Sequence, residues 1–224
     1  MLLTLFTGCR GDLDDVGLSF GGEYLPYIGK TRESVVNALA LDASTEDPSV
    51  CNLDQTVEVA GEPYTVQLRF SGAYTGYPVE NDPDGDALVL NYVRFERMVE
   101  SADRQEKTDA VWEVYDLLRT ELGEPEPIVQ AYEKETLDYA LKNGFPTTSV
   151  SAKWLLSEEP DYPETDYTGT SYEGAENLLI TELQVEFHAD SLLIQVWHRI
   201  QNTRNSHMER YRDIWHWGEE QIVS

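Results

Sequence analysis

A stretch of strict alternation, Tyr64 to Phe70, constrains the fold of this 224-residue chain more than any other feature. On an extended backbone successive side chains point to opposite sides, so the stretch predicts a strand with one apolar and one polar side. The two sides are Tyr64, Val66, Leu68 and Phe70 against Thr65, Gln67 and Arg69. Thr56 to Val59 alternates in the same way, with Ala60-Gly61-Glu62-Pro63 between the two stretches. The pattern therefore predicts an antiparallel hairpin.

Further strands are predicted on either side of a helical region. Ala87 to Phe95 has the composition of a third strand, and Thr147 to Leu156 of another. Leu179 to Phe187 and Leu192 to Ile200 flank the short polar segment Ala189-Asp190. This arrangement predicts a second hairpin in the C-terminal half of the chain.

Helical patterns occupy much of the remaining sequence. Thr31 can cap a short helix, because its hydroxyl can accept from the first free backbone N–H groups. From Asp103 to Leu122 apolar residues recur at helical spacing, and Gly123 provides a stop. Two more helices are expected, one from Pro127 to Asn143 and one from Met208 to Ile222.

These elements together predict an α+β fold, an antiparallel β-sheet with helices packed on one face. Residues 28–224 form either one domain or two tandem similar halves, 28–122 and 123–224. The second alternative rests on element order and on the shared tripeptides Tyr74-Thr75-Gly76 and Tyr167-Thr168-Gly169.

The first nine residues resemble the end of a bacterial lipoprotein signal peptide. A short apolar run, Met1 to Thr7, ends in Gly8 and Cys9, and a polar, acidic stretch follows. Cys9 is therefore expected to carry the lipid and to be the first residue of an exported, membrane-anchored protein. The Gly- and Asp-rich residues 10–27 are then a tether or an irregular lead-in. Cys51 would be a lone thiol in that case, whereas an unmodified Cys9 could form a bridge with it.

The alternative is a cytoplasmic protein in which Leu2 to Phe6 is the first strand. A strand that pairs within the sheet would favour this alternative over an export signal. Contact with a membrane is expected only through the lipid anchor, because no later segment approaches the roughly 18 unbroken apolar residues of a membrane span.

The charge balance limits the classes of partner. The net charge is −26, with 42 acidic residues against 16 basic ones. Such a field repels nucleic-acid backbones and anionic lipid surfaces, so no nucleic-acid partner is expected. It favours a partner with a basic surface, or else it reflects an acidic proteome in a salty habitat.

The run Ile28 to Val36, followed by a hairpin and further strands, resembles the start of small envelope lipoprotein domains. These domains are related to the β-lactamase inhibitor protein and to the outer-membrane assembly lipoprotein BamE. They open with a helix that a Gly-x-Thr/Ser-x-x-x-Val phrase introduces, and Gly29, Thr31 and Val35 match that phrase. The resemblance covers about the first hundred residues. It implies helices packed on one face of an antiparallel sheet, and binding of other proteins without chemistry.

Candidate catalytic and metal motifs do not have the context that they need. Gly17 to Gly21 matches Gly-x-Ser-x-Gly, but acidic residues precede it where a nucleophile elbow needs an apolar strand. Asp82, Asp84 and Asp86 alternate as in a calcium loop, yet Val93 stands where that loop needs a bidentate Glu. The segment is expected to be a turn, and the four histidines show no zinc-ligand spacing. We therefore expect no enzyme activity, no cofactor and no metal.

Two long loops rich in tyrosine remain as the candidate binding sites. Tyr74 and Tyr77 lie in the first loop, and Tyr162, Tyr167 and Tyr172 lie in the second. Loops of this length are often functional, and tyrosine provides a large contact area together with a hydroxyl that tolerates water. The alternative is that these rings fold back on their own loops. The tryptophans of the periodic segments are expected in the core instead: Trp112, Trp154, Trp197 and Trp215.

The expected function is non-enzymatic recognition of an envelope or extracellular protein by a lipid-anchored domain. One alternative is an acidic cytoplasmic protein, such as an immunity factor or a nucleic-acid mimic, that neutralises a basic partner. The other is a polysaccharide-binding module or an unrecognised hydrolase. Aromatic side chains lining a cleft beside paired carboxylates would favour the latter.

Overall fold

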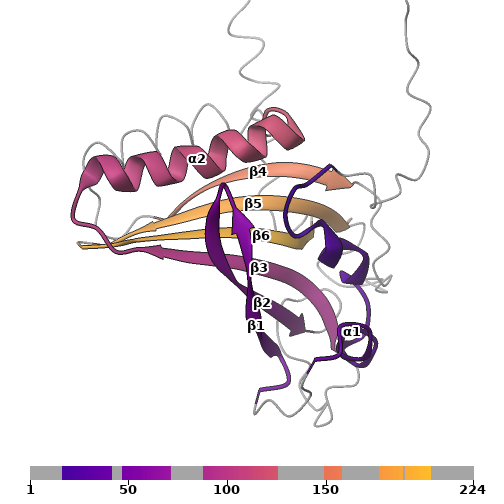
Figure 1. Ribbon diagram of the computed structural model, residues 1–224. Coiled ribbons are helices and arrows are strands. Elements are labelled where there is room, and N and C mark those ends of the chain that lie inside the picture. The colour runs from indigo at the N-terminus through magenta and orange to yellow at the C-terminus, as the bar shows by residue number, and fades with distance from the viewer. Residues whose placement is uncertain are drawn as a thin grey trace, which may run out of the picture.

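The computed structural model describes residues 17–41, 47–71, 88–125, 149–157, 177–188 and 190–202. Within them, six strands form one antiparallel sheet, accompanied by a 3₁₀-helix and two α-helices (Figure 1). The elements in chain order are η2 (Gly22–Tyr27), α1 (Arg32–Ala38), β1 (Val50–Val59), β2 (Glu62–Ser71), β3 (Val89–Val99), α2 (Arg104–Leu122), β4 (Ser149–Ser157), β5 (Asn177–Phe187) and β6 (Leu192–Asn202). The mixed α+β class predicted from the sequence is thus confirmed. The helices predicted over 127–143 and 208–222 lie outside the described residues.

The order of strands in the sheet is β1-β2-β3-β6-β5-β4. Each half of the chain therefore contributes a three-stranded antiparallel meander, and the two meanders meet where β3 pairs with β6. The tyrosine-bearing connections are not equivalent in these meanders. The first joins β2 to β3, whereas the second joins β4 to β5. The shared tripeptides consequently do not occupy corresponding positions of a repeat.

The hairpin predicted from alternation is β1-β2. Val59 pairs with Glu62, so the turn is the dipeptide Ala60-Gly61, and both of its residues have positive φ, 52° and 79°. This backbone matches the twist of the strands, and glycine adopts it without steric cost. The predicted apolar side is buried throughout: Tyr64, Val66, Leu68 and Phe70.

Both described α-helices begin where the sequence predicts, and α2 also ends there. The Thr31 hydroxyl accepts a hydrogen bond from the Ser34 backbone N–H at the start of α1. At the start of α2, the Asp103 carboxylate accepts from the Gln105 N–H. Gly123, with φ 84°, ends α2 and donates its N–H to the Arg119 carbonyl.

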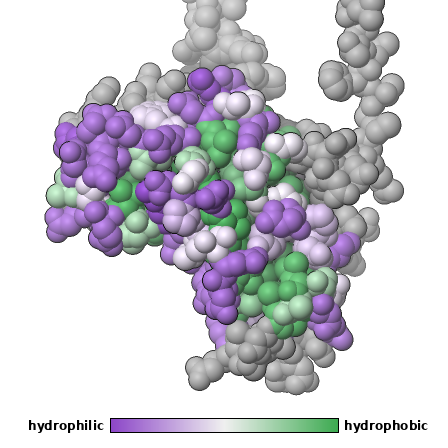
Figure 2. All heavy atoms as spheres, viewed as in Figure 1, coloured by the Kyte–Doolittle hydropathy of each residue, from purple (hydrophilic) through white to green (hydrophobic). Residues whose placement is uncertain are grey.

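Helix α2 packs against the β4 end of the sheet, as Figure 1 shows. The rings of Tyr115 and Trp154 lie 5.8 Å apart, and the Trp154 indole donates to the Gly123 carbonyl at 3.0 Å. In Figure 2 the outer surface of α2 is mostly hydrophilic, while apolar side chains gather beside α1. The buried residues of α2 are therefore on its sheet side: Ala110, Val111, Val114, Tyr115 and Leu118.

The described part of the lead-in, residues 17–27, packs into the core. Phe20, Tyr24 and Leu25 are each at most 2% exposed, and the Gln55 amide of β1 donates to the Tyr24 hydroxyl at 2.7 Å. Immediately afterwards, residues 29–32 pair with the start of β3 through three backbone hydrogen bonds. Residues 17–27 are therefore part of the domain.

Candidate functional site

The residues that the sequence predicts as functional all lie outside the described residues. This holds for Cys9 and for the acidic segment with Asp82, Asp84 and Asp86. It also holds for the five loop tyrosines, Tyr74, Tyr77, Tyr162, Tyr167 and Tyr172. Within the described ranges, no three His, Cys, Asp or Glu side chains gather as a metal site, and no helix is long and apolar enough to cross a membrane.

The strand register does place the entry points of both tyrosine loops. Arg69, Tyr92, Arg199, Ile180 and Leu155 form one row across five strands. The strand residues that flank the two loops lie beyond this row, at one end of the sheet. Ser71 and Val89 flank the first loop, and Ser157 and Asn177 flank the second. Only β6 separates β3 from β5, so at ~4.8 Å per strand the loops re-enter the sheet about 10 Å apart.

The Gly-x-Ser-x-Gly motif does not form a nucleophile elbow. Residues 17–21 are not in a strand, and the 3₁₀-helix η2 follows them. The Ser19 N–H donates to the Glu121 carboxylate of α2 at 3.1 Å, and Phe20 is buried. The motif thus attaches the lead-in to the core.

His198 lies at the centre of the sheet with no exposed surface. Its Nδ1 is 2.9 Å from the Thr181 hydroxyl, and the rings of Phe20 and Phe95 lie 5.7 and 5.2 Å from its own. Burial lowers the pKa of His198 to about 4, although the Phe20 backbone opposes part of the shift. A neutral imidazole therefore packs between the sheet and the lead-in, which is a structural role.

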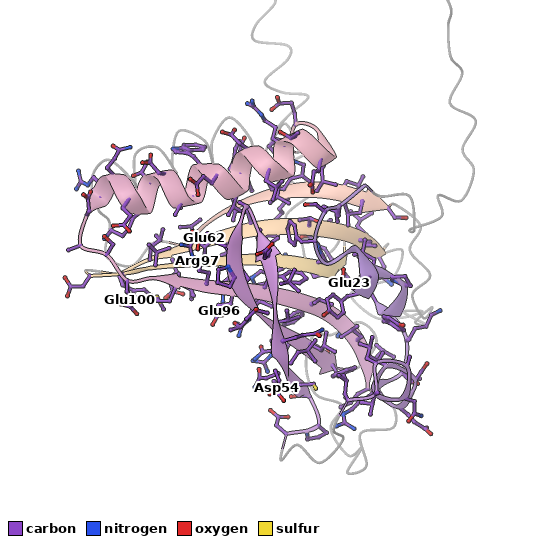
Figure 3. All side chains as sticks on the ribbon, viewed as in Figure 1. Glu23, Asp54, Glu62, Glu96, Arg97 and Glu100 are labelled. Carbon is purple, nitrogen blue, oxygen red and sulfur yellow. The ribbon has the colours of Figure 1, made fainter. Side chains whose placement is uncertain are left out.

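The opposite side of the same strands carries mostly polar and aromatic side chains, with Ile180 and Glu182 among them at most 8% exposed. Three neighbouring cross-strand rows, which we call the polar face, alternate in register with the buried row of Leu68, Val93 and His198. Figure 3 shows the alternation on β3, where Arg97 lies on the α2 side and Glu96 on the other. The rows are Arg69-Tyr92-Arg199-Ile180-Leu155, Gln67-Arg94-Trp197-Glu182-Lys153 and Thr65-Glu96-Gln195-Gln184.

An aromatic stack occupies the middle of the polar face. The rings of Tyr92 and Trp197 lie 4.9 Å apart at 30°, and the Arg94 guanidinium lies over the Trp197 ring at 5.7 Å. The sequence predicted Trp197 in the core, which is wrong. Trp197 is only partly buried and pairs with Arg94 across β3 and β6, because the alternation of β6 turns odd-numbered residues away from the core.

The charged residues of the polar face form short-range pairs. Glu182 accepts from Arg199 at 2.6 Å and lies 3.9 Å from Lys153, and Glu96 lies 3.3 Å from Arg94. The three rows hold four cationic side chains and two carboxylates, the fourth cation being Arg69. These three rows therefore carry a surplus of two positive charges on a chain whose net charge is −26, while the next row on the same side adds Glu58 and Glu186.

Two donors in the central row have no acceptor among the described residues. They are the Arg94 Nε and the Trp197 Nε1, which occupy directly paired positions and are shielded from water. The Gln201 Nε2, further along β6, is in the same state. A shielded donor without an acceptor costs about 1–3 kcal/mol, so these atoms favour a partner that supplies acceptors.

The comparisons with known proteins identify no relative. No family model matches the sequence, and neither a curated protein nor a solved structure is found to be similar.

Proposed function

We propose that this protein is a non-enzymatic protein-binding module, held outside the cytoplasm by a lipid on Cys9. The apolar run Met1 to Thr7 and the small Gly8 before Cys9 support the anchor. The partner is an envelope or extracellular protein with a basic surface, because a chain of net charge −26 speeds encounter with such a surface.

The observation that carries this proposal is the shared end of the sheet from which both tyrosine loops leave. Loop entries about 10 Å apart allow two separate segments to contribute to a single binding surface. Tyrosine side chains suit such a surface, because they combine large contact area with little conformational entropy to lose. Partner binding is therefore assigned to Tyr74, Tyr77, Tyr162, Tyr167 and Tyr172.

We also infer that the helices pack on one face of the sheet. The lead-in contacts Phe95 and His198, and α2 contacts Trp154; these three side chains share one side in the strand register. Helices on one face are what the resemblance to the β-lactamase inhibitor protein and BamE-like domains implies. In this arrangement the described helices and the lead-in do not cover the polar face.

The anchor predicts the location of the protein. Expressed with its native upstream region, the wild type is expected in the membrane fraction, and the Cys9→Ala variant in the soluble fraction. Cys51→Ala is the matched control, because Cys51 is buried in the core and cannot accept a lipid there. Wild type and Cys9→Ala that both remain soluble, with residues 1–8 retained, would favour the cytoplasmic alternative.

The loops predict how the partner is held. In a pull-down from envelope extracts, Tyr74→Ala/Tyr77→Ala and Tyr167→Ala/Tyr172→Ala are each expected to reduce capture, since a tyrosine at a hot spot contributes ~2 kcal/mol or more. The matching Tyr→Phe pairs keep the rings and should retain most binding. Added salt should slow association and leave dissociation nearly unchanged. Equal capture by wild type and both alanine variants would place the site elsewhere.

A further inference from the structure

We propose that the polar face is a second binding site, which takes an acidic polypeptide segment through its carboxylates. This site lies on the sheet itself, it does not use the loop tyrosines, and it does not rest on the proposed function above. Its centre is the directly paired Arg94 and Trp197.

The donors of the central row determine the chemistry of the ligand. The N–H groups of Arg94 Nε and Trp197 Nε1 have no acceptor among the described residues. Both atoms are donors, so only an acceptor can satisfy them. Arg94 keeps a fifth of its side chain exposed, so the guanidinium can turn toward a ligand. Together with the surplus of two positive charges, these groups fit a carboxylate, which accepts from both an arginine and an indole.

The spacing of the donors favours a polymer over a small anion. The Gln201 Nε2 has no described acceptor, although the Oε1 of the same amide accepts from Arg199, and it lies four residues along β6 from Trp197, about 13 Å in a strand. A single phosphate or carboxylate cannot reach both positions, whereas an extended peptide with repeated acceptors can.

The packing of Trp197 favours a polypeptide over a glycan. Sugar rings bind to open aromatic faces, but Tyr92 and Arg94 already pack against the Trp197 ring. The composition of the polar face also favours a polypeptide, because Trp, Tyr and Arg are enriched at the residues that contribute most to protein–protein binding.

The negative charge of the whole chain determines the conditions for a test. At long range a net charge of −26 repels an acidic peptide, so the cations of the polar face act only on contact. In about 0.5 M salt the Debye length is about 4 Å, which screens the long-range repulsion while leaving contacts within the site.

Titration of the ¹⁵N-labelled protein with hexaglutamate tests the proposal directly. The indole N–H resonance of Trp197, assigned with Trp197→Phe, is expected to move as its donor gains an acceptor. The Trp154 indole is the internal control, because it already donates to the Gly123 carbonyl and should stay in place.

Matched variants separate the site from net charge. Arg94→Gln is expected to weaken hexaglutamate binding about tenfold, the effect of losing one charge-assisted hydrogen bond. Arg119→Gln changes the net charge equally but lies on α2, and should bind as the wild type does. An unchanged Trp154 resonance confirms that a variant is folded, and Lys153→Gln in the same row provides a second variant.

Four results would overturn the inference. They are a Trp197 resonance that does not move, equal weakening by Arg119→Gln, the same shift with inorganic phosphate alone, and a shift with oligogalacturonate but not with hexaglutamate. The third would indicate a small-anion site, and the fourth a glycan site. None of these results tests the loop tyrosines, so the proposed function is tested separately.

Discussion

Gly21→Ala is expected to lower the free energy of unfolding by about 4 kcal/mol. Gly21 has φ 69°, a conformation that costs an alanine ~1–2 kcal/mol. An added Cβ would also lie 2.7 Å from His198 Nε2 and closer still to the Phe95 ring, and overpacking of this kind costs ~1–3 kcal/mol. Urea unfolding followed by tryptophan fluorescence measures the loss as a lower midpoint.

Gly61→Ala is the control that isolates the steric contribution. Gly61 has φ 79°, but a Cβ there would meet no atom within 4 Å. Its cost should therefore be about 1 kcal/mol, from the backbone conformation alone. Similar losses in the two variants would mean that the lead-in does not pack on His198 and Phe95 as described.

The second large effect is a loss of stability in acid that His198 causes. The unfolded imidazole takes up a proton near pH 6.5, whereas the folded one does so only near pH 4. Between these values the unfolded state binds more protons, so the free energy of unfolding falls as the pH falls through this window. At ~1.4 kcal/mol per pKa unit the full loss is roughly 3 kcal/mol.

His198→Leu removes this contribution and leaves every carboxylate in place. At neutral pH the variant should be less stable, because Thr181 loses its hydrogen-bond partner. As the pH falls from 7 to 4, the free energy of unfolding of the wild type is expected to fall by roughly 3 kcal/mol relative to that of the variant. His188→Leu, at an exposed position beyond β5, controls for the loss of an imidazole elsewhere. A constant difference across the pH range would refute the assignment.

Local sequence patterns were sufficient for much of the secondary structure. The β1-β2 hairpin, the capped start of α1 and the stop of α2 at Gly123 were all predicted and are confirmed. Each depends on residues within one element or one turn, where alternation, capping and positive φ act over a few positions. For the same reason the β5-β6 hairpin was predicted with nearly its observed bounds.

The packing of the lead-in was not predictable in this way. Residues 17–27 are polar and rich in glycine on average, but three of their side chains are buried. Their partners, Phe95 and His198, come from strands about 75 and 180 positions along the chain, and no local pattern relates them. In the sequence Gly21 is only the last residue of the Gly-x-Ser-x-Gly match, and the close approach of two rings is what makes a side chain there costly.

The polar face was missed although its signal is present in the sequence. Tyr92, Arg94 and Glu96 alternate with buried residues on β3, as Trp197 and Arg199 do on β6. Alternation assigns such residues to the outer side of each strand, but it says nothing about which strands are neighbours. The pairing of β3 with β6 brings Arg94 to Trp197 from about a hundred positions apart.

By itself, the sequence determined which segments are helices or strands, where most of them end, and that the chain has a negative net charge. These properties depend on short-range periodicity and on composition. Only the tertiary structure decided that β3 and β6 meet at the centre and that the lead-in covers a neutral histidine. It also decided that four cationic side chains, far apart in the sequence, lie in two neighbouring rows of the sheet. Strand order is a choice among many long-range pairings that the same local pattern allows, and the packing of the whole core selects among them.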